Sequence, residues 1–343
     1  MRHINIPIFI PHLGCPNQCI FCNQRYISGT EQFNIEDVDS QIETVLSGIN
    51  DDACCEIAFF GGSFTGIERD LMINLLDKAQ KYVNDGKVTS IRLSTRPDYI
   101  NPEIINILKK YTISAIELGI QSFSDEVLSK CKRGHTVYDT IEAIRLLNEA
   151  QIDFVGQMMI GLPGSTIDDE VFCAKKICEL GAVGTRIYPT IVFANTELEE
   201  LKENGEYLPL NVDEAVERSA IVLDVFLKNN VNCLRIGLCD SENLHSSDTF
   251  VAGPNSPSIG ELVKSKLFLY KIINKLKYCQ IDDIQNKDLI IYCPQNLKSQ
   301  IIGHKRKNIA EISNKYKFNR IVVKEDLKLD AFKIKIQLEG GKA

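Results

Sequence analysis

Residues 15–22 read Cys-Pro-Asn-Gln-Cys-Ile-Phe-Cys, so the thiols of Cys15, Cys19 and Cys22 form a CxxxCxxC pattern. The stretch follows a short apolar run over residues 4–10, which is closed by a proline and a glycine. Such a run predicts a β-strand, and the two residues that follow it predict a turn. We therefore expect the three cysteines in a loop beyond the C-terminal end of the first strand.

A loop this short can wrap three thiolates around one iron–sulfur cube, because sulfur ligands suit iron and need little backbone span. A cube is normally held by four cysteines, so a set of three would leave one iron open to a small molecule. Buried thiols, a zinc site and a disulfide are the alternatives. Zinc would need a fourth ligand, for which His12 is the only nearby candidate. A disulfide framework is typical of small secreted domains, which this chain of 343 residues is not.

The whole chain has the composition of a soluble globular protein, with 44% hydrophobic and 25% charged residues. No apolar run approaches the roughly 20 residues that are needed to cross a bilayer. The N-terminus leads into a strand without the charged-then-apolar pattern of a signal peptide. Twelve cysteines without an export signal indicate a reducing compartment. We expect a cytoplasmic protein with no membrane partner.

Charge is divided unevenly along the chain. Residues 257–343 contain 18 Lys and Arg against 9 Asp and Glu, a net charge of +9. Residues 1–256 contain 21 basic and 37 acidic residues, a net charge of −16. An acidic body with a basic tail is expected when one module handles a polyanion.

Strand and helix patterns alternate over residues 1–240, and six such β/α units predict parallel strands with right-handed crossovers. A doubly wound sheet and a barrel both fit, and in both of them ligands gather at the C-terminal ends of the strands. The predicted strands are 4–10, 56–60, 89–94, 115–120, 154–162 and 184–192, and the predicted helices are 36–48, 69–84, 101–110, 136–150, 167–180 and 196–203.

Several further motifs begin at these strand ends. They are Phe60-Gly61-Gly62-Ser63-Phe64, Ser94-Thr95-Arg96-Pro97-Asp98-Tyr99, Glu117-Leu118-Gly119-Ile120-Gln121-Ser122, Arg133-Gly134-His135-Thr136 and Ile187-Tyr188-Pro189-Thr190. Together with the cysteine pattern and an aromatic residue, Phe21, before its last cysteine, the series resembles the radical S-adenosylmethionine (SAM) superfamily. Over about residues 1–240 it resembles the radical SAM domain of the Elongator catalytic subunit, a tRNA-modifying enzyme. The cysteine loop is shorter than is usual in that family, and its acetyltransferase domain is absent here.

This resemblance implies an open six-stranded (β/α)6 barrel that binds a 4Fe–4S cluster and SAM. Cys15, Cys19 and Cys22 would be the cluster ligands and so the catalytic residues. Reductive cleavage of SAM would give a 5′-deoxyadenosyl radical, with the electron coming from an external donor. The residues implied around SAM are Phe21, Gly61, Gly62, Ser63, Ser94, Arg96, Glu117 and Gln121.

Plainer interpretations of these motifs remain open. The two adjacent glycines fit an ordinary tight turn, and Glu117 and Gln121 fit a solvated surface pair. Many relatives carry Glu where this chain has Ser94. The Arg133–Thr136 stretch could bind RNA or SAM, but Thr136 is equally suited to cap a helix.

The basic tail predicts a strand at 289–293, helices at 296–302 and 308–316, and strands at 319–324 and 331–338. Between the helices lie Gly303, His304, Lys305, Arg306 and Lys307. This arrangement resembles the KH module, whose GxxG loop clamps a single-stranded RNA backbone. Here Arg306 replaces the second glycine. A solvated helix–turn–helix is the alternative.

We expect three parts: a radical SAM barrel over 1–240, a linker and basic helix over 241–278, and a KH-like α+β RNA-binding domain over 279–343. The predicted function is radical SAM modification of RNA, with tRNA the first candidate. One alternative is an enzyme of the oxygen-independent coproporphyrinogen oxidase kind, which acts on a small molecule or carries haem. Another is a non-catalytic, redox-sensing RNA-binding protein. The modified nucleotide, the group transferred and the oligomeric state are not indicated by the sequence.

Overall fold

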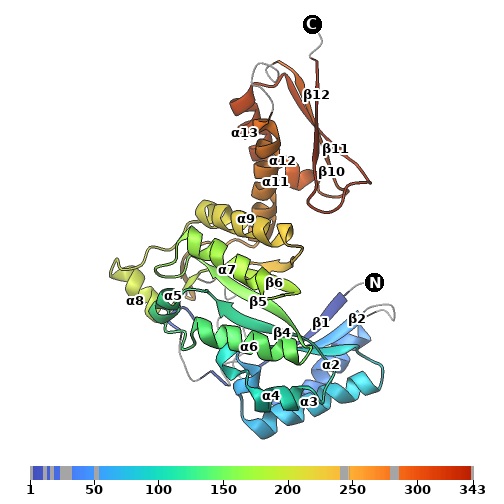
Figure 1. Ribbon diagram of the computed structural model, residues 1–343, viewed down its shortest axis with the longest axis vertical. Coiled ribbons are helices and arrows are strands. Elements are labelled where there is room, and N and C mark those ends of the chain that lie inside the picture. The colour runs from blue at the N-terminus through green and yellow to red at the C-terminus, as the bar shows by residue number, and fades with distance from the viewer. Residues whose placement is uncertain are drawn as a thin grey trace. The chain divides into compact units, whose positions relative to one another are not determined.

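The computed structural model describes residues 3–10, 14–15, 19–23, 33–49, 54–239, 246, 248–278 and 286–340. The chain divides into two compact units (Figure 1). The barrel unit comprises Met1–Asn211 and Val225–Asn255, and the C-terminal unit comprises Val212–Asp224 and Ser256–Ala343. In the described part of the chain, no helix is both long enough and apolar enough to cross a membrane.

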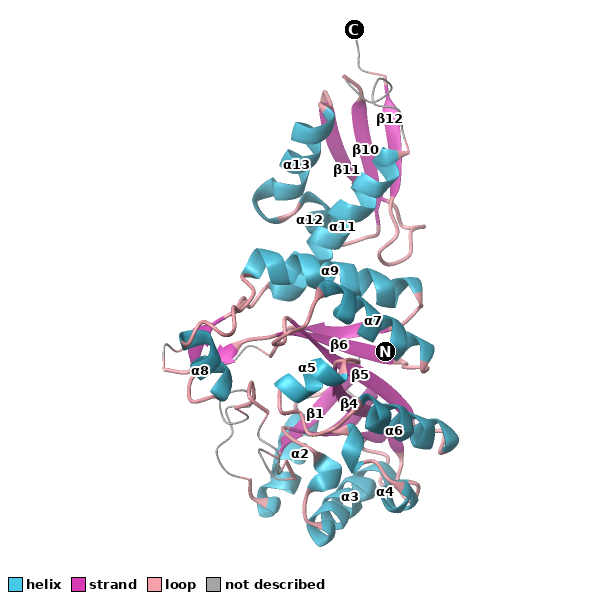
Figure 2. Ribbon diagram, turned by 60° about the vertical axis from the view of Figure 1, so that its left-hand side comes forward, coloured by secondary structure: helices cyan, strands magenta, loops and turns pink. Residues whose placement is uncertain are grey.

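The barrel unit is built on one parallel sheet that curls into a half-barrel (Figure 2), with the strand order β1-β2-β3-β4-β5-β6-β8. The six predicted strands are confirmed. They are β1 (His3–Phe9), β2 (Cys54–Phe60), β3 (Ser90–Thr95), β4 (Ile113–Gln121), β5 (Asp153–Ile160) and β6 (Gly184–Pro189). A seventh strand, β8 (Asn232–Ile236), pairs in parallel with β6. Apart from this sheet, β7 (Val192–Phe193) pairs with β9 (Phe250–Ala252).

The helices lie between the strands, as the alternating pattern predicts. They are α2 (Val38–Ser47), α3 (Arg69–Asn84), α4 (Pro102–Leu108), α5 (Asp125–Lys130), α6 (Val137–Glu149), α7 (Ile167–Glu179), α8 (Glu197–Glu203) and α9 (Val212–Lys228), the last of which contributes to both units. Side-chain hydrogen bonds to the backbone determine where several of these helices begin. Thr136 accepts a hydrogen bond from the Asp139 amide in a capping box that begins α6, so its predicted capping role is confirmed. Ser124 begins α5, a six-residue helix that the sequence did not predict.

The sheet buries charge on one of its faces. Along β4, Ile116, Leu118 and Ile120 alternate with Glu117, Gly119 and Gln121, so the two sets point to opposite faces. Glu117 Oε2 lies 2.6 Å from Arg186 Nε on β6, and Oε1 lies 3.7 Å from Arg92 Nη1 on β3. Arg92 Nε in turn donates to Glu56 on β2. Since Glu117 and Gln121 are 3% and 6% exposed, the alternative of a solvated surface pair is wrong.

We predict that Glu117→Gln destabilises the barrel unit by about 3–5 kcal/mol, because it leaves the buried guanidinium of Arg186 without its counter-charge. Native-state hydrogen exchange of the β4 and β6 amides measures this directly. The control is Glu126→Gln, which removes an exposed carboxylate paired with Lys130 at i,i+4 and should change little. Equal protection in the Glu117 variant and the wild type would contradict the prediction.

The C-terminal unit has the strand–helix–helix–strand order that the tail predicts. Its elements are α11 (Ile259–Lys277), β10 (Asp288–Cys293), α12 (Lys298–Ile302), α13 (Lys307–Tyr316), β11 (Arg320–Glu325) and β12 (Lys335–Glu339). The sheet order is β11-β10-β12, with β10 parallel to β11 and antiparallel to β12. Apolar residues of α11, among them Phe268 and Ile272, pack in one core with Ile291, Ile301 and Ile312. The basic helix is therefore part of this unit.

Candidate functional site

The cysteine loop follows β1, and its described residues lie against the turn after β2. Gly14 has φ +80°, and a Cβ at this position would collide with the backbone of the turn at the Ser63 carbonyl oxygen. Only glycine permits this approach. As a result Cys15 Sγ lies 3.1 Å from Ser63 Oγ, within hydrogen-bond distance.

The second half of the loop is held by backbone hydrogen bonds and apolar packing. The Ile20 amide donates to the Cys131 carbonyl (3.2 Å), and the Leu198 amide donates to the Ile20 carbonyl (2.9 Å). Cys19, Ile20 and Phe21 belong to one buried cluster, with Val127, Cys131, Leu162, Val192, Leu198 and Tyr207. The predicted SAM-site residue Phe21 therefore packs in the wall that supports the cysteines. Burial, together with the nearby Cys19, raises the pKa of Cys131 to about 12, so Cys131 stays a thiol.

Polar side chains gather at the C-terminal ends of β3 and β4. Arg96 is 1% exposed, and its Nε and Nη2 both donate to Asp98 at 2.9 Å. His135 Nε2 donates to the Ile120 carbonyl (3.3 Å), which leaves Nδ1 as the acceptor. Within the described residues, four buried atoms have no hydrogen-bond partner here: Arg96 Nη1, Gln121 Oε1, Arg133 Nε and His135 Nδ1. Buried polar atoms are rarely left unpaired, so this group is suited to receive a polar ligand.

Cys15 and Cys19 lie close enough to Arg96 to influence its pKa. Burial tends to lower the pKa of Arg96, but its hydrogen bonds to Asp98 and the charges of Asp98, Cys19 and Cys15 outweigh it and raise the pKa. Arg96 therefore stays a cation beside the thiols. Of its nitrogens, Nη1 is the buried one without a partner, so one arm of the fork can still bind an anionic group.

The two glycines after β2 supply backbone rather than side chains. Gly61 has φ +94°, and a Cβ there would lie 3.2 Å from the Ile10 amide nitrogen. Ser94 Oγ donates weakly to the carbonyls of Gly62 (3.3 Å) and Phe59 (3.4 Å). Ser63 is buried beside Cys15. Gly61, Gly62, Ser63 and Ser94 are thus brought together at the edge where the cysteines lie.

Glu117 stands apart from this group. It lies four residues before the end of β4 and is engaged by Arg186, whereas Gln121 lies at the end with φ +67°. Two further contributors come from the Arg133–Thr136 motif, for which the sequence left binding of RNA or SAM open. They are Arg133, which donates to Cys19 Sγ (3.4 Å), and the buried His135. Their motif was noticed, but local sequence does not reveal that the loop after α5 folds back onto the cysteines.

The side chains at this site can be compared with what a 4Fe–4S cluster requires. In the described residues, no three His, Cys, Asp or Glu side chains are grouped to hold a single metal ion. A 4Fe–4S cube differs from a single ion, since each of its cysteines binds a different iron. Three thiols of one loop, two neighbouring guanidinium groups and unpaired polar atoms fit a cluster with a polar ligand beside it.

Two family profiles match the chain. Residues 9–176 match the profile of the radical SAM superfamily, and residues 182–268 match the radical SAM C-terminal domain. The chain belongs to the radical SAM superfamily. The cofactors of this superfamily are a 4Fe–4S cluster and SAM, as the sequence predicts.

Three similar proteins illustrate the relationship. A tRNA uridine(34) acetyltransferase of Methanocaldococcus jannaschii is 37% identical over 147 residues, which are 41% of this chain and 27% of that protein. An uncharacterized protein of the same organism is 30% identical over 62% of this chain and 68% of its own length. The archaeal Methanocaldococcus infernus Elp3, solved without residues 1–46, matches with a TM-score of 0.60 and 25% identity over 80% of this chain and 63% of that one. The resemblance to the Elongator radical SAM domain is confirmed, although the chain spans only about a quarter of the first relative.

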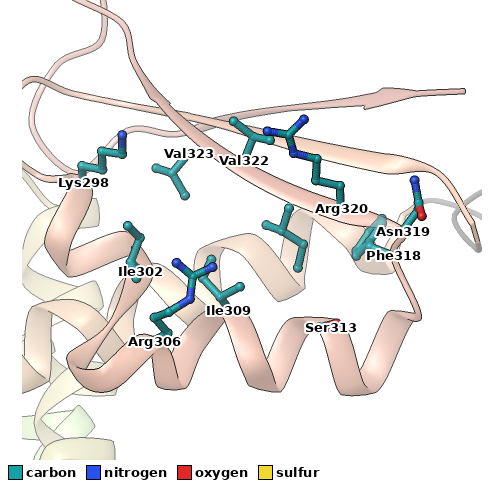
Figure 3. Close-up of a pocket in the computed structure, with 11 residues that line it drawn as sticks. Lys298, Ile302, Arg306, Ile309, Ser313, Phe318, Asn319, Arg320, Val322 and Val323 are labelled. Carbon is teal, nitrogen blue, oxygen red and sulfur yellow. The ribbon is translucent and has the colours of Figure 1, made fainter. Parts of the chain in front are cut away.

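A second candidate site is a groove of about 460 Å³ in the C-terminal unit, between α12, α13 and β11 (Figure 3). Aliphatic side chains, among them Ile302, Ile309 and Val323, line it. Three cations accompany them: Lys298 from α12, Arg320 from β11 and Arg306 from the loop before α13. Such a lining suits a ligand that has both apolar and anionic parts.

The predicted loop borders this groove. Lys305 and Arg306 have φ +49° and +62°, a left-handed conformation that costs a non-glycine residue about 1–2 kcal/mol. Of the five predicted RNA contacts, Arg306 lines the groove, while Lys307 pairs with Asp213 at the surface. Gly303 allows the loop to pass Asn308, because a Cβ there would lie 2.8 Å from its side chain. His304 and Lys305 are exposed. Lys298 and Arg320 were missed, since only the fold brings α12 and β11 together.

The buried imidazole of His135 predicts a pH effect on stability. Burial, then the charges of Arg133 and Arg96, lower its pKa from 6.5 to about 3. Between these values the unfolded chain binds a proton that the folded chain does not. The free energy of unfolding is therefore unaffected by protonation of His135 above pH 6.5. As the pH falls from 6.5 towards 3, it decreases by at most about 1.4 kcal/mol per pH unit. Urea unfolding of the wild type and His135→Gln at pH 7 and pH 5 should show a smaller loss in the variant. Parallel losses would contradict the prediction.

Proposed function

We propose that this protein is a radical SAM enzyme that modifies RNA, with tRNA as the first candidate. One observation carries the proposal: the same chain has a cysteine-bearing polar site in the barrel unit and a cation-lined groove in the basic C-terminal unit. The names of its relatives, a tRNA uridine(34) acetyltransferase and Elp3, support the choice of tRNA. The KH resemblance of the tail supports the choice of RNA.

In this proposal Cys15, Cys19 and Cys22 hold the cluster and leave one iron open to SAM. Together the two cofactors supply one-electron cleavage of SAM and hydrogen-atom abstraction, given an electron from an external donor. The chain's own part is to bind and to shield. Arg96 Nη1 is available to an anionic group such as a carboxylate, and Gln121 Oε1 and His135 Nδ1 are available to donors such as an ammonium or a hydroxyl.

Exclusion of water is the second task of the barrel unit. The buried cluster around Cys19 and Phe21 covers the cysteine loop on its protein side. An apolar wall of this kind protects a reactive intermediate from side reactions with water. Tyr207 closes part of it, since its hydroxyl donates to the Gly161 carbonyl at 2.7 Å.

The cluster ligands are tested by substitution. Replacement of Cys15, Cys19 and Cys22 by Ala should remove the iron and abolish release of 5′-deoxyadenosine in the presence of dithionite, because in the sequence no other three cysteines lie within eight residues. Iron content and product release are measured after anaerobic reconstitution. Cys178→Ala, on α7, is the matched control and should retain both. Turnover by the triple variant would refute the assignment.

The role of the groove in RNA binding is tested by removing its cations. Arg306→Gln and Arg320→Gln should each weaken tRNA binding and lower the salt slope of log K by about 1, as expected when one phosphate contact is lost. Filter binding over a range of salt measures both. Lys333→Gln removes an exposed cation of the same unit, paired with Asp330 and absent from the groove lining, and should leave the slope unchanged. No measurable RNA affinity of the wild type at low salt would favour a small-molecule substrate instead.

Nucleoside mass spectrometry tests the proposed reaction as a whole. RNA from cells with and without the gene should differ in one modified nucleoside, which would identify both the position and the group. Identical nucleoside profiles would contradict RNA modification while leaving the radical SAM assignment intact.

A further inference from the structure

Arg133 is a buried cation that contacts the sulfur of Cys19. It follows α5 and is 7% exposed, and the ion pairs among the described residues include no partner for it. Its Nη2 donates to the Gly119 carbonyl at 2.8 Å, and its Nη1 lies 3.4 Å from Cys19 Sγ in donor geometry. A buried charge is costly unless it is paired, so the sulfur of Cys19 is the group that can compensate it.

We propose that Arg133 is a positioning residue that raises the reduction potential of the cluster by donating a hydrogen bond to the sulfur of Cys19. The inference rests on the proposed role of Cys19 as a cluster ligand. Hydrogen bonds to the sulfurs and local charge are among the factors that set cluster potentials. Reduction adds negative charge, which a nearby cation stabilises, so Arg133 makes the cluster easier to reduce by the external donor.

The geometry restricts where the guanidinium can lie. Its Nη2 is held by β4 through Gly119, and a Cβ at Gly119 would lie 2.8 Å from this same nitrogen. A methyl group at position 119 therefore displaces the guanidinium without removing its charge. This gives an independent way to break the hydrogen bond, because φ of Gly119 is not in the left-handed region.

A purely structural role for Arg133 makes a different prediction. If the side chain only fastened the loop after α5 to β4, its loss would lower the iron content and leave the potential of the remaining clusters unchanged. A contact to SAM alone would change SAM affinity but not the potential measured without SAM. The potential of the SAM-free protein therefore separates the three roles.

The experiment is a redox titration of the full-length, anaerobically reconstituted protein, without SAM or RNA, followed by electron paramagnetic resonance of the reduced cluster. In Arg133→Gln the ratio of reduced to oxidised cluster at a fixed applied potential should fall about tenfold, which for one electron corresponds to ~59 mV. Gly119→Ala should shift the potential in the same direction. Arg133→Lys should shift it less, because it keeps the charge. The control is Lys132→Gln, which removes a neighbouring exposed cation paired with Glu197 and should titrate like the wild type.

Each outcome decides the matter. Wild-type potentials in iron-loaded Arg133→Gln and Gly119→Ala would overturn the proposal. Loss of iron from Arg133→Gln, Arg133→Lys and Gly119→Ala would also overturn it, because it would show a structural role. The variant Cys19→Ala distinguishes failure of the proposal for Arg133 from failure of the assignment of Cys19 as a cluster ligand. If Cys19→Ala keeps a full cluster, the ligand assignment is wrong. If it loses the cluster while Arg133→Gln titrates normally, only the inference fails.

Discussion

A parallel sheet brings the carboxyl ends of all its strands to one edge, and in this protein that constraint decides where polar atoms are buried. Deeper in the sheet, Glu117 and Arg186 form a buried ion pair, so neither charge is left uncompensated there. At the edge the balance is incomplete. Two nitrogens of Arg96 donate to a carboxylate, whereas Arg133 has no carboxylate partner among the residues that the structure describes. The fold thus concentrates unsatisfied donors and acceptors beside the cysteine loop, where cofactors can satisfy them.

This incomplete balance explains why the surrounding shell is so firmly built. Unpaired buried atoms destabilise a fold by about 1–3 kcal/mol each. They persist only where neighbouring packing holds them, as at strained functional sites in general. Here the supports are the apolar cluster around Phe21, the capping box that begins α6 at Thr136 and the hydrogen bond from Ile20 to Cys131. The supporting residues come from segments far apart in sequence.

A feature could be predicted from the sequence where the residues that produce it lie close together along the chain. Alternating apolar runs, the Thr136 cap and the cysteine spacing are local signals, and each was predicted. The β8 strand was not, although residues 231–238 read as an apolar segment, because Asn232–Ile236 are largely exposed and mix polar with apolar residues. The contact of Arg133 with Cys19 spans 114 residues, and the groove joins Lys298 to Arg320. Contacts of this kind depend on the assembled fold, so a motif such as Arg133–Thr136 can be noticed without its partner being identified.

The division of charge bears on how an RNA substrate would be handled. Residues 1–256 carry a net charge of −16, which repels a polyanion, and residues 257–343 carry +9. Affinity for RNA would then have to come from the tail, and the barrel site would meet its target at the effective concentration that the covalent connection provides. The net negative charge of residues 1–256 would weaken binding of RNA that the tail does not also hold, so the charge pattern would favour substrates that engage both units.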